Sequence, residues 1–100
     1  PPGYTDADFS NTNMRDSDFE RLFKIIENSS VITSLSLLES GIREHHIAPL
    51  TNAILKNNSI VDIQLQKYND YSEETKANID KMLEHAESIR EENLIKRPVL

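Results

Sequence analysis

The sequence predicts an α/β fold built from three successive strand-helix units of equal length. An apolar-x-x-apolar-x-apolar pattern at 32–37 (Ile-Thr-Ser-Leu-Ser-Leu) returns at 60–65 (Ile-Val-Asp-Ile-Gln-Leu), and 60 − 32 gives a period of 28 residues. The same spacing leads back to 4–9 (Tyr-Thr-Asp-Ala-Asp-Phe), which has the pattern with weaker members. A helical pattern of apolar residues follows each copy. A fixed period of this length is typical of a repeat architecture.

The composition restricts the class of protein. A chain of 100 residues forms one domain, 1–100, and no cysteine is present for a disulfide or a thiolate metal site. The net charge of −6 argues against binding to nucleic acids or anionic membranes and suits a partner with a basic surface. No apolar run approaches the roughly 18 residues of a membrane span. We expect a cytoplasmic protein, and a fragment of a longer one.

The first unit covers 4–31. Its strand at 4–9 alternates polar and apolar residues, as a half-buried strand does. A polar turn follows at 10–13. Ser17 and Glu20 have the spacing of a capping box, which predicts that the helix starts at Ser17. The apolar face of this helix consists of Phe19, Leu22, Phe23 and Ile26.

The second unit covers 32–59. Its strand at 32–37 is followed by a turn, after which Ile42 returns to the core. We predict a helix over about 46–56, in which Pro49 is tolerated because it falls in the first turn. The inner face of this helix consists of Ile47, Leu50, Ala53 and Ile54.

The third unit covers 60–93. A strand at 60–65 and a turn at 68–71 lead to Ser72, a good N-cap, with acidic residues next to it at the positive end of the helix. The helix is predicted to run to about Glu92, with a charged outer face as in a terminal capping unit. The tail 94–100 either folds back or frays. The helix's apolar face consists of Ile79, Met82, Leu83, Ala86 and Ile89.

The period also links the turns. Asn13, Gly41 and Asn69 are 28 residues apart, and Gly and Asn tolerate a left-handed backbone best. We therefore predict that one turn geometry is used three times.

These residues resemble leucine-rich repeats of the ribonuclease-inhibitor-like subclass. Ile32, Leu35 and Leu37, followed by Gly41 and Ile42, match the family pattern L-x-x-L-x-L-x-x-N-x-[IL], with Gly41 at its Asn position. The helix and return segment 47–60 are also similar to that subclass. The resemblance implies a short solenoid of three parallel strand-helix units with a long C-terminal capping helix.

The end of the chain adds a narrower resemblance. Segment 79–83 and segment 89–93 resemble the C-terminal end of tropomodulin-like domains, which cap the pointed end of actin filaments. This resemblance implies actin as the partner. Repeats of the same kind also occur in effector proteins of intracellular bacteria, so that source stays open.

The candidate functional surface is the concave face of the expected sheet. Apolar strand residues point to the helices, so the residues between them point outward. We interpret this face as a non-enzymatic protein-protein interaction surface, with a merely solvated sheet face as the alternative. Its residues are Asp6, Asp8, Ser10, Ser34, Ser36, Leu38, Asp62, Gln64 and Gln66.

The first strand lies at an open edge, and an unpaired edge strand invites pairing with another chain. Two interpretations follow: more repeats precede the sequence, or two copies associate through this edge. Asp6 and Asp8 could instead protect the edge against such pairing.

Catalytic or metal chemistry is the weaker interpretation. Segment 44–46 (Glu-His-His) has metal-ligand residue types, but adjacent side chains at a helix start are expected to point different ways. His85 stands alone on a charged helix. The carboxylates at 6–10 lack the Gly and Glu of a calcium loop. We therefore predict no enzyme, no cofactor and no metal.

The last helix could also pair with a partner helix as a coiled coil. Its apolar stripe is single, however, and the sheet needs it as cover. Its expected charged neighbours are Glu73 with Lys76, Lys76 with Asp80, and Glu87 with Glu91.

Overall fold

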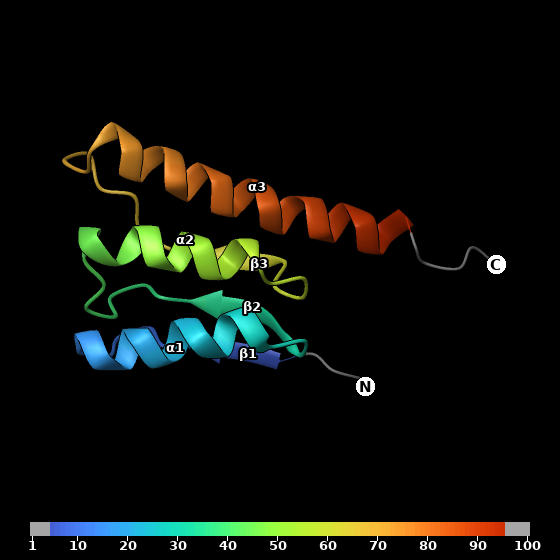
Figure 1. The fold of residues 1–100 in the computed structure, drawn as a ribbon, viewed down its shortest axis with the longest axis horizontal. Coiled ribbons are helices and arrows are strands. Elements are labelled where there is room, and N and C mark those ends of the chain that lie inside the picture. The colour runs from blue at the N-terminus through green and yellow to red at the C-terminus, as the bar shows by residue number, and fades with distance from the viewer. Residues whose placement is uncertain (1–4, 96–100) are drawn as a thin grey trace.

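The computed structural model describes residues 5–95, along which strands and helices alternate (Figure 1). The strands are β1 (Thr5–Asp8), β2 (Ile32–Ser36) and β3 (Asp62–Gln64). The helices are α1 (Asp16–Asn28), α2 (Ile47–Leu55), which continues a short 3-10 turn η1 (Glu44–His46), and α3 (Glu73–Ile95). The predicted strand-helix order is confirmed over this range. Residues 1–4, with the start of the first predicted strand, and 96–100 of the predicted tail lie outside the described residues.

The strands form one parallel sheet in the order β1-β2-β3 within residues 5–95. Ala7 pairs with Leu35 and Leu35 with Ile63, so the register follows the 28-residue period. The ladder extends past β1, where Phe9 N–H donates to Ser36 O and Asn11 N–H to Leu38 O, at 2.9 and 3.0 Å. The parallel arrangement expected from the sequence is therefore confirmed.

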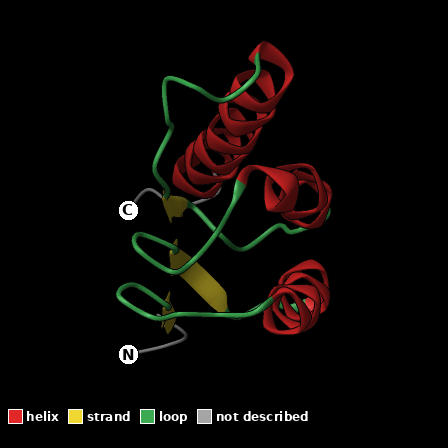
Figure 2. Ribbon diagram, turned by 90° about the vertical axis from the view of Figure 1, so that its left-hand side faces the viewer, coloured by secondary structure: helices red, strands yellow, loops and turns green. Residues whose placement is uncertain are grey.

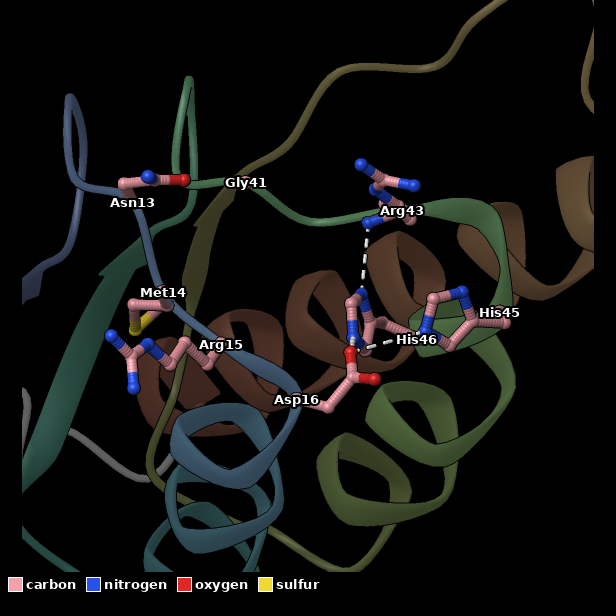
Figure 3. Close-up of a pocket in the computed structure, with 8 residues that line it drawn as sticks. All are labelled: Asn13, Met14, Arg15, Asp16, Gly41, Arg43, His45 and His46. Atoms are coloured by element: carbon pink, nitrogen blue, oxygen red, sulfur yellow. Dashed lines mark hydrogen bonds and ion pairs between the residues drawn. The ribbon is translucent and has the colours of Figure 1, made fainter.

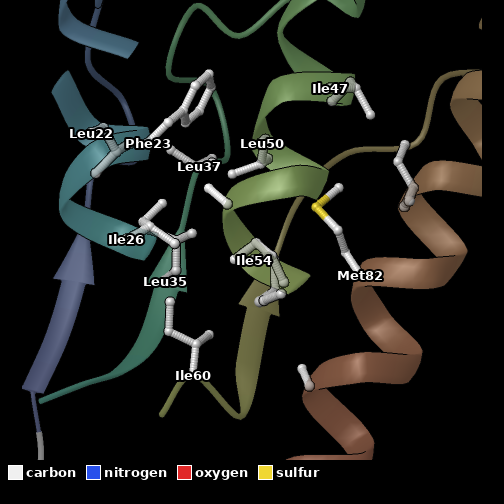
Figure 4. Close-up of a cluster of buried hydrophobic side chains, with 14 of the residues drawn as sticks. Leu22, Phe23, Ile26, Leu35, Leu37, Ile47, Leu50, Ile54, Ile60 and Met82 are labelled. Carbon is white, nitrogen blue, oxygen red and sulfur yellow. The ribbon is translucent and has the colours of Figure 1, made fainter. Parts of the chain in front are cut away.

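All three described helices cover the same face of the sheet and leave the other face open (Figure 2). The core between the layers contains every apolar helix residue predicted for α1 and α2, together with Leu35 and Leu37, which are fully buried (Figure 4). On α3, four predicted core residues are buried, but Leu83 is 43% exposed and the prediction for it is wrong. The buried apolar stripe of α3 is therefore narrower than the sequence pattern indicated.

The start of α1 differs from the predicted capping box. The helix begins at Asp16, and Asp18 accepts a hydrogen bond from the backbone N–H of Arg15 at 2.9 Å. The same bond recurs one period later, where His46 Nδ1 accepts from Arg43 N–H at 2.9 Å. In both units, the side chain three residues after the N-cap residue accepts a hydrogen bond from the backbone N–H of the N-cap residue and so holds the first turn. Ser17 plays no part in this bond. Ser72 does cap α3, since its Oγ accepts from Thr75 N–H.

The left-handed turn is repeated at a different position from the predicted one. Among the described residues, positive φ occurs at Asn11 (57°), Glu39 (54°) and Gly41 (88°). The prediction is right for Gly41 and wrong for Asn13 and Asn69. Asn11 and Glu39 are themselves 28 residues apart (39 − 11), so the period does set the turn geometry in the first two units.

A buried asparagine joins the first two units at the other end of the sheet. Asn57 is 1% exposed, and its Nδ2 donates to Ile26 O at 2.8 Å and Ser29 O at 3.1 Å. Its Oδ1 accepts from Ser59 N–H and Ile60 N–H. One side chain therefore both ends α1 and shapes the return to β3. Every buried side-chain polar atom of the described residues has a partner, as native interiors require.

The long α3 is fastened at both ends. Glu73 and Lys76 form the predicted ion pair at 3.2 Å, whereas Asp80 pairs with Lys67 of the preceding loop rather than with Lys76. Near the C-terminal end, Arg90 Nη2 donates to Val61 O at 2.7 Å. The helix continues to Ile95, beyond the predicted end, and Ile95 is 82% exposed.

Candidate functional site

The open face of the sheet presents the nine sequence-predicted residues as three rows. The ladder pairs Asp6 with Ser34 and Ser34 with Asp62 in one row. It pairs Asp8, Ser36 and Gln64 in the next row. The third row, Ser10, Leu38 and Gln66, follows two residues further along each strand.

This surface is polar and acidic. Asp6, Asp8, Asp62 and Gln64 are exposed and the other members are half-buried, while the alternate residues point into the core. The carboxylate of Asp8 accepts hydrogen bonds from the hydroxyl and the backbone N–H of Ser10, and these bonds lower the pKa of Asp8. Asp62 lies 4.0 Å from Arg90 Nη2, so α3 partly offsets the negative charge at one corner.

The rim of the face adds residues that the sequence interpretation left out. Gln66 Nε2 donates to Glu39 Oε1 at 3.1 Å, and Tyr68 Oη donates to Gln66 Oε1 at 2.9 Å. Tyr68 is 43% exposed and packs edge-on against buried Tyr71. This chain of contacts links an aromatic ring, through Gln66 of the third row, to the carboxylate of Glu39, which follows half-buried Leu38 in the sequence. The sequence showed a turn at 68–71, and only the inter-unit contacts reveal its place on the rim.

A second cluster lies where α1 and η1 begin (Figure 3). Asp16 Oδ1 is 2.7 Å from His46 Nε2 and 3.2 Å from His45 Nε2, and the two imidazole rings pack at a tilt of 42° with centroids 4.0 Å apart. The expectation that these adjacent histidines point different ways is wrong, because the helix start of the first unit draws both onto one carboxylate. The cluster borders a cavity of about 330 Å³, also lined by Asn13, Met14, Arg15, Gly41 and Arg43.

The hydrogen bonds define the tautomer of His46. Its Nδ1 accepts from the backbone N–H of Arg43, so the ring proton is on Nε2 and is donated to Asp16. His46 is 6% exposed and lies on Phe19, with ring centroids 4.2 Å apart. Hydrogen bonds from His46 and then His45 lower the pKa of Asp16. Both nitrogens of His46 are therefore engaged in structural bonds.

These bonds decide what the cluster can do chemically. The three side chains have metal-ligand types with donor atoms within 4.8 Å of one another. A metal-bound histidine, however, normally donates its other N–H to an acceptor, whereas His46 Nδ1 faces a donor. Binding a metal at Nε2 would require the ring to lose its last proton. The same engagement leaves His46 without a lone pair to act as a general base.

The other predicted candidates have structural roles. His85 is not isolated, because its Nε2 lies 2.7 Å from Asn57 O and links α3 to the second unit. Glu44 accepts from Ser72 N–H at 2.9 Å and Thr75 Oγ1 at 2.8 Å, which lowers the pKa of Glu44. Glu44 follows Asp16 by 28 residues. The acidic residue at the start of α1 thus bonds to the start of η1, and the acidic residue at the start of η1 bonds to the start of α3.

Comparison of the chain with known protein families, curated proteins and solved structures finds no match. Within residues 5–95, the structure has no helix of the length and apolarity needed to cross a bilayer.

Proposed function

We propose that the chain is a non-enzymatic interaction module whose open sheet face binds a protein with a basic surface. The observation that carries the proposal is the three-row polar face, which the described helices leave uncovered. Concave sheet faces of stacked repeats commonly serve as binding surfaces. The exposed carboxylates of Asp6, Asp8 and Asp62 favour Lys and Arg on the partner.

The proposal includes the architecture. We interpret the three units as a short leucine-rich-repeat solenoid of the ribonuclease-inhibitor-like subclass, divided at 4–31, 32–59 and 60–93. Three features support this: the parallel register of 28 residues, the buried Leu35 and Leu37, and the recurrence of inter-unit bonds at the same spacing. The absence of cysteine from the sequence favours the cytoplasm as its location.

In this proposal the apolar contact area lies at the rim of the binding surface. Tyr68 and Leu38 supply apolar contact area, and Glu39 supplies a charge next to them. Tyrosine contributes more than its share to interface energies because it combines a rigid apolar ring with a hydroxyl. The carboxylates of the first two rows then orient the partner, since exposed charges mainly steer association.

The proposal is tested with a lysine-rich peptide followed by amide chemical shifts. We expect the shifted amides to cluster at 6–10, 34–38 and 62–68. Asp62→Lys should weaken binding, whereas Glu84→Lys makes the same charge change on the exposed outer side of α3 and should leave binding largely unchanged. Equal weakening by both variants, or shifts spread over the helices, would contradict the proposal.

A captured natural partner offers a second test. Leu38→Asp and Asp62→Lys should each reduce its recovery, and Glu84→Lys should not. If neither concave-face variant changes any captured protein, the assignment of this face fails.

A second candidate function is the capping of actin filament pointed ends, as in tropomodulin-like domains. The observation that favours it is the 23-residue α3, which closes the last unit and extends to an exposed apolar end at Leu94 and Ile95. Elongation of actin from pointed ends separates the two candidates. If the chain inhibits this elongation and Leu94→Asp abolishes the inhibition, capping is supported. If elongation is unchanged and the chain pellets with actin filaments only at the background level, capping is rejected.

A further inference from the structure

An apolar groove runs along the outer side of the first unit, at the sheet edge formed by β1. Its volume is about 290 Å³. Phe9 and Met14 are half-buried, and Ile25 is 55% exposed, the largest exposure of any apolar residue lining the groove. The remaining lining residues are Asp18, Arg21 and Leu22.

The residues at the same places in the second unit indicate what kind of surface such a groove contacts. Moving 28 residues along the chain, the apolar lining residues become Leu37, Ile42, Leu50 and Ala53. Leu37, Leu50 and Ala53 are at most 1% exposed because the first unit packs on them. The groove therefore has the shape and apolarity of a surface that a packed neighbour covers.

The polar residues of the first unit differ from those at the same places in the second unit. In the second unit, His46 and Asn57 reach back to the first. Their equivalents are Asp18 and Ser29, which bond within their own unit: Asp18 to Arg15 N–H and Arg21, and Ser29 Oγ to the N–H groups that follow it. The two bridging side chains of the second unit are therefore not repeated in the first.

The rim of the groove is suited to a copy of itself. Asp18 Oδ1 and Arg21 Nη2 lie 3.3 Å apart on one side of the apolar strip. In a two-fold symmetric contact a patch faces its own copy, so each carboxylate can approach the guanidinium of the other chain. Direct pairing of β1 with β1 would place Asp6 near Asp8 of the other chain, and facing like charges destabilise a sheet.

We propose that two copies of this chain associate groove to groove along α1, with Ile25 buried in the contact and Asp18 opposite Arg21. The contact leaves the open sheet face free, so it is independent of the proposed partner binding. In the dimer, the other copy covers Phe9 and Met14. Leu37 and Ile42, the equivalent residues of the second unit, are packed in the core in the same way.

Sedimentation equilibrium tests the proposal directly. We expect the natural chain to be a reversible dimer, with Ile25→Glu raising the dissociation constant by about tenfold or more. Leu83→Glu alters an apolar residue of 43% exposure on α3 and should change it by less than about twofold. A natural chain that stays monomeric to about 1 mM overturns the proposal, as does equal weakening by both variants.

A charge reversal on α1 adds a second test that does not depend on the apolar residue. Arg21→Glu should weaken the dimer, because it places an acid near Asp18 of the other chain. Lys24→Glu makes the same charge change on an exposed side chain that does not line the groove. Circular dichroism confirms that each variant is folded. If Lys24→Glu weakens the dimer as much as Arg21→Glu, the assigned contact is wrong.

Discussion

Asp16 Oδ1 lies 2.7 Å from Nε2 of His46, thirty residues later in the chain. His46 Nδ1 accepts a hydrogen bond from a backbone N–H at the same time, and its ring packs at a tilt against Phe19. A single buried imidazole therefore joins the starts of two helices.

Replacement of His46 by alanine should destabilise the fold. It removes two hydrogen bonds and leaves Arg43 N–H without its acceptor, so we expect a loss of about 2 kcal/mol in the free energy of unfolding. Urea denaturation measures it. His45→Ala is the matched control, because the side chain of His45 is 60% exposed and its loss should cost less than about 0.5 kcal/mol. Equal losses for the two variants would contradict this account.

Zinc should have no effect on thermal unfolding. His46 carries its proton on Nε2 and has a donor facing Nδ1, so the cluster offers zinc one exposed imidazole and one carboxylate. Two exposed ligands hold zinc weakly compared with the four ligands of structural sites. We expect the same unfolding midpoint with and without added Zn²⁺. A rise in the midpoint that is lost in His46→Ala would show that the tautomer is misassigned.

Asn57 should be among the most sensitive polar positions. Alanine at this site leaves Ser59 N–H and Ile60 N–H without their acceptor, and it leaves Ile26 O with only the longer bond from Ser29 N–H at 3.4 Å. We expect a cost of about 3 kcal/mol in the free energy of unfolding. Asn58→Ala, which alters the exposed neighbouring side chain, should cost less than about 0.5 kcal/mol. A small effect at Asn57 would mean that water replaces its bonds.

Gly41 should not tolerate a side chain. Its φ is +88°, and a Cβ there would lie 3.2 Å from Met14 O. We expect Gly41→Ala to cost about 1–2 kcal/mol from the left-handed backbone alone, with the close contact adding to it. Asn69→Ala is the control, since Asn69 occupies the equivalent place in the sequence but has negative φ. Thermal unfolding compares the two variants, and equal midpoints would reject the assigned turn.

Stability should fall as the solution becomes acidic. Hydrogen bonds hold the pKa values of Asp16 and Glu44 below their ordinary 3.8 and 4.5. A carboxyl group whose pKa is lower in the folded state stabilises the fold above its unfolded pKa, and this contribution is lost as the pH falls through the folded value. The contribution of these two carboxylates should therefore be lost as the pH falls below about 4.5, and the urea midpoint should decline there. Glu44→Gln should flatten the decline, and an unchanged slope would exclude Glu44 as a contributor.

The sequence predicted the repeating part of this structure well. A spacing of 28 residues between apolar triplets was enough to align Ala7, Leu35 and Ile63 on neighbouring strands. The helix faces followed from the 3.6-residue periodicity, because burial of an apolar stripe is a local property of the sequence. Leu83 is the exception, since its exposure depends on how α3 packs against the rest of the chain, which is a tertiary property.

The polar contacts between units were not predicted, although the period contained a signal for them. Asp16 and Glu44 occupy the same place in successive units, and each bonds to the helix start of the next unit. The partners differ chemically, however: imidazoles in one unit, and a backbone N–H with a hydroxyl in the next. The partner residues therefore form no repeating sequence pattern, and only the structure shows that the contact itself is repeated.

The rim of the open face was missed for a related reason. Tyr68 belongs to a turn whose sequence suggests only a change of direction. Its hydroxyl reaches Gln66, and Gln66 in turn reaches Glu39 in the previous unit. Position on a rim depends on how loops from different units stack, which a linear pattern does not encode.

The acids at the helix starts have one more effect. Glu44 of η1 bonds to Ser72 and Thr75 in the first turn of α3, so η1 loses these bonds when the last helix detaches. If η1 then unfolds, Asp16 of α1 loses its bond to His46. We therefore expect that no single unit unfolds by itself from either end of the domain. We expect the slowest amide protons of all three helices to exchange together, in a single cooperative opening.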